Sequence, residues 1–389
     1  MLYRRFGKTE LQIPVFTCGG MRFQHSWKDL NRVPKASQER LEATVRRAID
    51  LGINHIETAR GYGSSEYQLG RILSDYPREE LIVQTKVAPA ATADEFERML
   101  ERSLSLLKLD YVDLMSLHGV NSWQVLDWSL GKGGCLEVVR RYMDQGVIRH
   151  VGFSTHGPLE LILRAIESEE FEYVNLHWYY INQRNWPAIE RARGLDMGVF
   201  IISPTDKGGR LYAPPPALEA AVDPLSPMLF NDLFCLSRPQ VHTLSIGASR
   251  PSDFDEHVKA LPYLEGGPEE LTSVVAVGVR RMRQGISDRL GVDRCTFCHQ
   301  CLPCPEDVNI PEILRLRNLD VAFEMRAFGQ DRYNLLGNGG HWAPGQNATH
   351  CNECGDCLPR CPENLDIVRL LRDAHGRLHS QPKLRLSES

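Results

Sequence analysis

Eight of the eleven cysteines in this 389-residue chain lie between Cys295 and Cys361, in two motifs of similar spacing. The motifs place their cysteines at Cys295, Cys298, Cys301 and Cys304, and at Cys351, Cys354, Cys357 and Cys361, and a proline follows the last cysteine of each. Three cysteines separated by two residues can surround one face of an iron–sulfur cluster, and a distant Cys-Pro ligates the other cluster in two-cluster ferredoxins. The spacing therefore predicts iron–sulfur chemistry.

Disulfides and zinc are the alternative uses of clustered cysteines. Disulfide scaffolds belong to small secreted domains, whereas the basic start of this chain has no apolar segment behind it and predicts no signal peptide. Zinc needs four ligands per site, usually from pairs of Cys-x-x-Cys, which two triplets match less well. We expect the remaining Cys18, Cys135 and Cys235 to be buried and inert.

A second group of reactive side chains comprises Glu57, Tyr62, Lys86 and His118. A tyrosine donates a proton to a carbonyl oxygen only if its pKa, ordinarily about 10, moves toward neutrality. A nearby ammonium favours the phenolate and has that effect. A carboxylate keeps the lysine charged, and a histidine orients the carbonyl by a hydrogen bond. The four residues together predict carbonyl reduction.

These side chains need a scaffold that brings distant segments together. Short β-branched runs predict eight strands, near Val15–Cys18, His55–Thr58, Ile82–Lys86, Val112–His118, Val151–Ser154, Val174–Trp178, Val199–Ile202 and Thr243–Ile246. Segments of helical period lie between them, such as Arg40–Leu51, and this alternation implies parallel strands with right-handed crossovers. Eight such units in about 250 residues predict an α/β fold, a (β/α)8 TIM barrel, whose active site lies at the strand C-terminal ends. The competing architecture is an open doubly wound sheet, which typically has the motif Gly-x-Gly-x-x-Gly after its first strand. The residues Gly19-Gly20-Met21-Arg22 do not match that motif.

Three motifs resemble the active site of the aldo/keto reductase superfamily, namely Ile56-Glu57-Thr58-Ala59-Arg60-Gly61-Tyr62-Gly63, Thr85-Lys86-Val87 and Leu117-His118-Gly119. The resemblance runs from about residue 3 to residue 262. It implies a barrel that binds NAD(P)H and uses an Asp–Tyr–Lys–His tetrad, with Tyr62 as general acid, Lys86 tuning it and His118 orienting the carbonyl. Glu57 stands where the family usually has Asp and is one methylene longer.

The same resemblance implies the cofactor contacts Gly20, Met21, Ser154, Thr155, Asn175, Ser203, Lys207, Gly208, Ser249, Arg250, Glu256 and His257. Ser154, Thr155 and Asn175 match positions that hold the nicotinamide carboxamide. The loops after strands seven and eight form the phosphate corner of such barrels, so we expect Ser203–Gly209 at the pyrophosphate and Ser249–Arg250 at a 2′-phosphate. Glu256 and His257 match the adenine contacts. NADPH is the expected cofactor. NADH is the alternative, because Asp253 sits where many NADP-dependent members carry Arg, and a carboxylate there would repel the 2′-phosphate.

The cysteine-rich segment resembles the helical type of two-[4Fe–4S] ferredoxin module, and the whole layout resembles a recognised branch of the superfamily. The resemblance implies one cluster on Cys295, Cys298, Cys301 and Cys361 and a second on Cys351, Cys354, Cys357 and Cys304. We expect a barrel over residues 1–270, then a helical linker and a small α-helical ferredoxin-like iron–sulfur domain over 271–389. Ile310–Phe328 is predicted to be one helix, and the polar closing segment Gln381–Ser389 to be frayed.

Composition narrows the partners and leaves two functions open. A net charge of −5 gives no reason to expect nucleic acid, and no apolar run approaches the roughly 20 residues that span a membrane, so we expect a cytoplasmic protein. One function is NAD(P)H-dependent reduction of a small-molecule carbonyl; the other is electron transfer or redox sensing with the barrel as a nicotinamide-binding platform. Three roles of the clusters stay open: they support the structure, accept electrons from a ferredoxin-like partner, or sense redox state or oxygen. Trp27, Trp123 and Trp178 suggest an aromatic pocket but name no substrate.

Overall fold

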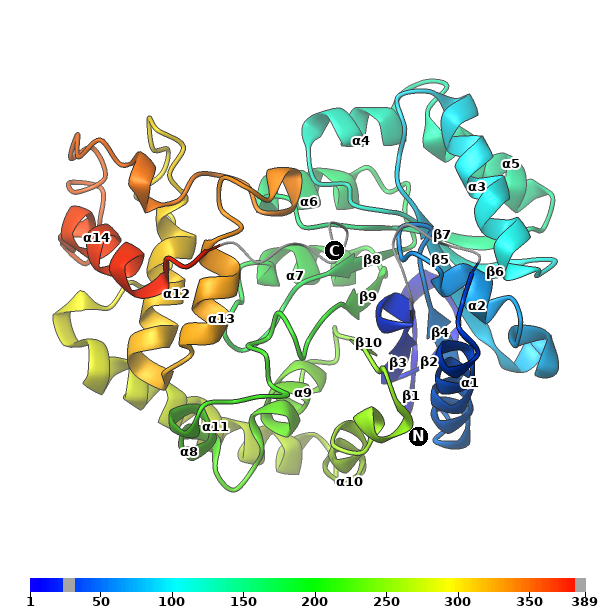
Figure 1. Ribbon diagram of the computed structural model, residues 1–389, viewed down its shortest axis with the longest axis horizontal. Helices are drawn as coiled ribbons and strands as arrows, with labels where there is room; N and C mark the ends of the chain where they lie inside the picture. The colour runs from blue at the N-terminus through cyan, green and yellow to red at the C-terminus, as the bar shows by residue number, and fades with distance from the viewer. Residues whose placement is uncertain (24–31, 382–389) are drawn as a thin grey trace. The chain divides into compact units, whose positions relative to one another are not determined.

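A computed structural model describes residues 1–23 and 32–381 (Figure 1). The chain divides into two compact units, one of Met1–Gly208 with Asn231–Pro268 and the other of Gly209–Phe230 with Glu269–Ser389. The sequence predicts a single boundary after residue 270. In the structure the segment Gly209–Phe230 also groups with the C-terminal residues. Trp27 and the closing residues 382–389 lie outside the described residues.

The first unit is a closed barrel of eight parallel strands, ordered β10-β3-β4-β5-β6-β7-β8-β9 (Figure 1). The strands are β3 (Phe16–Gly19), β4 (His55–Glu57), β5 (Ile82–Val87), β6 (Val112–Leu117), β7 (Ile148–Ser154), β8 (Tyr173–Leu176), β9 (Gly198–Ile201) and β10 (Thr243–Ile246). All eight predicted strands are present, and the predicted (β/α)8 fold is confirmed.

Helices alternate with the barrel strands along the chain, as in a (β/α)8 fold. They are α1 (Lys35–Asp50), α2 (Ser65–Leu69), α3 (Ala93–Leu107), α4 (Trp123–Leu130), α5 (Cys135–Asp144), α6 (Leu159–Glu167), α7 (Trp186–Gly194), α9 (Pro227–Leu236) and α10 (Leu261–Glu265). Helix α3 illustrates the local signals: the Thr92 hydroxyl accepts the Glu95 N–H at its start, and it buries Phe96 and Leu100 on one face.

A hairpin of β1 (Tyr3–Arg5) and β2 (Gln12–Pro14) precedes the barrel. Phe6 and Ile13 from this hairpin region pack in one cluster with residues near the strand N-terminal ends, including Ile82 and Tyr173. This end of the barrel is therefore closed by apolar side chains. The hairpin was not predicted, since strands of three residues carry too few positions to show an alternating pattern.

The second unit is helical, with α8 (Pro216–Val222), α11 (Pro268–Leu290), α12 (Ile310–Phe323), α13 (Arg326–Tyr333) and α14 (Ile367–Leu378). The prediction of one helix over Ile310–Phe328 is wrong, because Glu324 adopts a left-handed conformation with φ of 58° and ends α12. Among the described residues, we find no helix with the length and apolar content needed to cross a membrane.

Candidate functional site

The four reactive residues of the barrel stand at the C-terminal ends of neighbouring strands. Glu57 is the last residue of β4, Lys86 is the penultimate residue of β5, and His118 directly follows β6. Tyr62 lies in the loop after β4, where its backbone N–H bonds the Ala59 carbonyl. Parallel pairing of β4 with β5 and of β5 with β6 brings these segments side by side. The barrel mouth therefore gathers all four.

Lys86 is the centre of this group, and its side chain is 1% exposed. Its ammonium forms an ion pair with Glu57, donates to the Thr58 carbonyl over 3.0 Å, and lies 3.3 Å from the Tyr62 hydroxyl oxygen. Glu57 Oε2 also accepts a hydrogen bond from Ser245 Oγ over 3.2 Å. The longer carboxylate thus retains the pairing with lysine, and Ser245 on β10 holds its second oxygen.

Tyr62 and His118 face each other at the mouth. Their ring centroids are 5.6 Å apart in an edge-to-face arrangement, and the Lys86 ammonium lies 4.8 Å from the Tyr62 ring centroid. The phenol hydroxyl and the imidazole are therefore adjacent, as proton donation to a carbonyl and its orientation both require. The Lys86 ammonium contacts the hydroxyl of this phenol.

Burial dominates the electrostatics of this group. It raises the pKa of Tyr62 above the ordinary value and lowers the pKa of Lys86 below its own. The expectation that the ammonium brings the tyrosine pKa toward neutrality is therefore wrong for this structure, because desolvation of the phenolate outweighs the attraction of the ammonium. The phenol therefore keeps its proton at neutral pH.

Three residues expected at the nicotinamide carboxamide lie on β7 and β8. Ser154 Oγ accepts the Gly119 N–H over 3.1 Å. The Thr155 hydroxyl donates to the Val120 carbonyl over 2.7 Å and accepts the Gly157 N–H, so it holds a loop. Within the described residues, both polar atoms of the buried Asn175 amide lack a hydrogen-bond partner. A buried unsatisfied amide is unusual, and it fits a carboxamide ligand that accepts one bond and donates another.

The loop after β9 carries Ser203, Lys207 and Gly208, expected at the pyrophosphate. Ser203 has φ of 54°, and a Cβ on Gly208 would overlap the Pro204 carbonyl oxygen. The Lys207 ammonium lies 3.1 Å from His156 Nδ1 and 3.2 Å from His177 Nε2. Two imidazoles thus hold the lysine at the ends of β7 and β8.

The remaining cofactor candidates lie in different environments. Gly20 packs against the backbone of Glu57, whereas Met21 is 46% exposed. Ser249 and Arg250 both bond to Asp253, and Glu256 pairs with Lys259. His257 is buried, with Nδ1 2.5 Å from Asp232 Oδ2. The Asp232 carboxylate thus holds one nitrogen of this imidazole in the core.

The aromatic residues suggested for the pocket also separate. Trp178 is buried and stacks on Phe234 with ring centroids 4.8 Å apart, so it belongs to the core. Trp123, at the start of α4, is 53% exposed. Of these two, only Trp123 offers its ring to a ligand.

Two cavities among the described residues of the second unit are each lined by four cysteines. One is lined by Cys304, Cys351, Cys354 and Cys357. The other is lined by Cys295, Cys298, Cys301 and Cys361. The last cysteine of each motif thus lines the cavity of the other motif. None of the cysteines, all of which are described, forms a disulfide. Four thiols around one space are the donor set of a [4Fe–4S] cluster.

Comparison with known protein families matches each unit separately. Residues 16–193 match the model of the aldo/keto reductase family, and residues 294–365 match that of the 4Fe-4S dicluster domain. The chain is an aldo/keto reductase domain followed by a 4Fe-4S dicluster domain. The protein is accordingly an oxidoreductase. In the structure, the aldo/keto reductase barrel continues past the matched span to include β9 and β10.

Individual relatives agree with this assignment. L-glyceraldehyde 3-phosphate reductase of Escherichia coli O157:H7 is 24% identical and covers 74% of this chain and 96% of its own. An aldo-keto reductase of Mycolicibacterium paratuberculosis is 38% identical over 37% of this chain and 49% of its own. The crystal structure of an aldo-keto reductase from Klebsiella pneumoniae in complex with NADPH has a TM-score of 0.55 and 18% identity, and covers 72% of this chain and 95% of that one. At this identity it shows the fold alone.

Several residues around the reductase site were missed by sequence reasoning. Ser245 supports Glu57, and His156 and His177 hold Lys207. Each pairing joins residues 30 or more positions apart, so spacing along the chain gives no signal for it. The motif Gly152-Phe153-Ser154-Thr155-His156 did contain one of these histidines.

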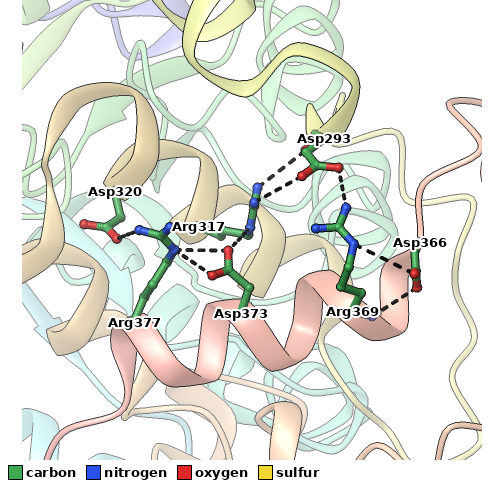
Figure 2. Close-up of polar contacts among 7 residues, drawn as sticks. All are labelled: Asp293, Arg317, Asp320, Asp366, Arg369, Asp373 and Arg377. Carbon is green, nitrogen blue, oxygen red and sulfur yellow. Dashed lines mark hydrogen bonds and ion pairs between the residues drawn. The ribbon is translucent and has the colours of Figure 1, made fainter.

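An ion-pair network supports the first cysteine motif of the dicluster domain (Figure 2). Asp293, two residues before Cys295, pairs with Arg317 on α12 and Arg369 on α14. Arg317 also bonds Asp373 over 2.6 Å, and Arg377 joins Asp373 to Asp320.

This network fixes the chain at the point where it enters the first motif. Burial alone would raise the pKa of Asp373, but hydrogen bonds from Arg317 and Arg377 lower it, so the carboxylate stays charged. Next to Arg317 on α12, Asn318 donates to the carbonyl of Cys295 over 2.8 Å. Helix α12 thus holds both Asp293 and Cys295.

Proposed function

We propose that the protein reduces an aldehyde or ketone with hydride from NAD(P)H. The observation that carries this proposal is the Tyr62 hydroxyl, held 3.3 Å from the Lys86 ammonium, which is itself paired with Glu57, beside the His118 ring. Bound nicotinamide supplies the hydride. The protein residues orient the carbonyl and deliver a proton to its oxygen.

Each residue of the site has one task in this proposal. Tyr62 donates its proton to the carbonyl oxygen, because burial keeps the phenol protonated. The Lys86 ammonium stabilises the negative charge left on the phenol oxygen, and Glu57 keeps that ammonium charged. His118 donates a hydrogen bond that orients the carbonyl. The relatives that are named reductases, including L-glyceraldehyde 3-phosphate reductase, support an aldehyde substrate.

Asn175 binds the carboxamide of the nicotinamide in this proposal. We expect Asn175→Leu to raise the dissociation constant of the nicotinamide cofactor about tenfold, since two hydrogen bonds are lost. The same substitution removes an unsatisfied buried amide, so the free energy of unfolding stays equal or rises. Cofactor fluorescence titration and chemical unfolding measure the two effects.

Thr155→Val is the matched control for that prediction. The Thr155 hydroxyl bonds Val120 and Gly157, so its loss lowers the free energy of unfolding by about 1 kcal/mol. If Asn175→Leu destabilises the protein and leaves cofactor binding unchanged, the amide serves the fold and not the cofactor.

The C-terminal unit binds two [4Fe–4S] clusters in this proposal, one in each cysteine-lined cavity. The donor sets of four cysteines support it. They also favour a second candidate function, in which this unit exchanges electrons with a ferredoxin-like partner and the barrel is a nicotinamide-binding platform.

An anaerobic titration separates the two functions. We expect the nicotinamide absorbance to fall only after an aldehyde such as glyceraldehyde 3-phosphate is added, while the visible absorbance of the clusters stays constant. A hydride carries two electrons, whereas each cluster accepts one. Bleaching of the clusters by NADH or NADPH with no carbonyl present would instead support the electron-transfer function. NADH and NADPH are each tested.

A further inference from the structure

The corner after β10 holds the residues expected at the 2′-phosphate of NADPH, and they converge on one carboxylate. Asp253 lies on a short 3-10 helix, η5 (Pro251–Phe254). Its Oδ2 accepts the Ser249 N–H over 2.8 Å, the Ser249 hydroxyl over 3.0 Å and the Arg250 N–H over 3.3 Å. Its Oδ1 accepts the Arg250 Nε–H over 2.9 Å. The donors that would meet a phosphate are already bonded within the chain.

Other cations of this corner are also paired. Arg47 on α1 bonds Asp255 over 3.1 Å, and Lys259 bonds Glu256 over 2.6 Å. Partial burial raises the pKa of Asp253, but the hydrogen bonds from Ser249 and Arg250 outweigh it and lower that pKa overall. Asp253 is therefore a carboxylate at neutral pH, in a corner where Arg250, Arg47 and Lys259 each pair with an acidic side chain.

We propose that Asp253 makes the protein select NADH over NADPH. This inference rests on the proposed function and replaces NADPH, the cofactor expected from the sequence. A 2′-phosphate carries about two negative charges at neutral pH, and it would have to displace Asp253 to reach Ser249 and Arg250. The ribose of NADH carries hydroxyls instead, which a carboxylate accepts, as acidic residues do in other dinucleotide sites.

The hydrogen-bonding capacity of the carboxylate agrees with this selection. A carboxylate has about four acceptor positions, two on each oxygen. Among the residues that the structure describes, Oδ2 accepts three donors, whereas Oδ1 accepts one bond, from Arg250. Oδ1 thus retains capacity for a ribose hydroxyl without loss of the bonds that order the loop.

Equilibrium binding to the full-length, cluster-loaded protein tests the inference without turnover. We expect NADH to bind at least about tenfold more tightly than NADPH, and AMP more tightly than adenosine 2′,5′-bisphosphate, in calorimetric titrations. Asp253→Asn removes the charge and frees Arg250, so it should shift the NADH-to-NADPH ratio at least about tenfold toward NADPH.

Asp255→Asn is the matched control. It removes the same charge two residues further along the chain, and the Asp255 side chain pairs with Arg47. It should change the ratio by less than about twofold. If the unsubstituted protein binds NADPH more tightly than NADH, the proposed selectivity is wrong and the proposed function stands. The same conclusion follows if Asp253→Asn and Asp255→Asn shift the NADH-to-NADPH binding ratio equally. If neither coenzyme binds, the proposed function is wrong, and so is this inference.

Discussion

Tyr62→Phe should lower kcat for carbonyl reduction by at least about a hundredfold, and by as much as ten-thousandfold, the range typical for loss of a general acid. The substitution removes the hydroxyl that lies 3.3 Å from the Lys86 ammonium and keeps the ring against His118. Cofactor binding and iron content should stay unchanged, because neither depends on the phenol. Steady-state turnover, cofactor titration and iron analysis of the same preparation check the three statements.

Tyr67→Phe is the matched control for this prediction. Tyr67 lies on α2, five residues further along the chain, and its ring stacks with the Arg71 guanidinium at 5.9 Å. The same chemical change there should leave turnover within about twofold, as surface substitutions usually do. Full activity of Tyr62→Phe in carbonyl reduction would show that Tyr62 is not the general acid.

The pH dependence of turnover follows from the same residue. Burial raises the pKa of Tyr62, so the protonated acid persists to higher pH than in an exposed tyrosine. The rate of reduction attributable to this acid should therefore stay constant up to about pH 10, the ordinary tyrosine value. The reverse oxidation needs the phenolate and should rise with pH instead. A fall in reduction between pH 6 and 8 would assign the controlling group elsewhere.

Much of the barrel could be predicted from the sequence because its signals are local. Strands buried on both faces read as short apolar runs, as β9 does, and amphipathic helices such as α3 show their period directly. The tetrad could be found because each member lies at, or shortly after, the C-terminal end of a strand, which fixes its place at the barrel mouth before any coordinates are known.

The remaining features depend on distances that the sequence does not contain. The direction of the Tyr62 pKa shift is set by burial, which outweighs the neighbouring ammonium. His257 was expected at adenine but lies against Asp232, 25 residues away. The end of α12 at Phe323 depends on a left-handed Glu324, a residue type that seldom signals such a turn.

The crossed arrangement of cysteines leads to the second large effect. Cys304 lines the cavity of Cys351, whereas Cys295 lines the other cavity. The double variant Cys304→Ala with Cys351→Ala should therefore lose one cluster and about half of the iron. Cys304→Ala with Cys295→Ala removes a ligand from each cluster and should lose nearly all of it, since each site needs its four thiolates.

The two double variants serve as controls for each other, because each removes two of the eight cysteines and one of them is the same. Alanine is used because it offers no oxygen ligand. Uncrossed ligation predicts the reverse order of iron contents, as Cys295 and Cys304 would then share a cluster. Iron and sulfide analysis gives the stoichiometry, and electron paramagnetic resonance of the reduced protein shows which cluster remains. Equal loss in both variants would mean that the clusters assemble only together, and the crossed assignment would fail.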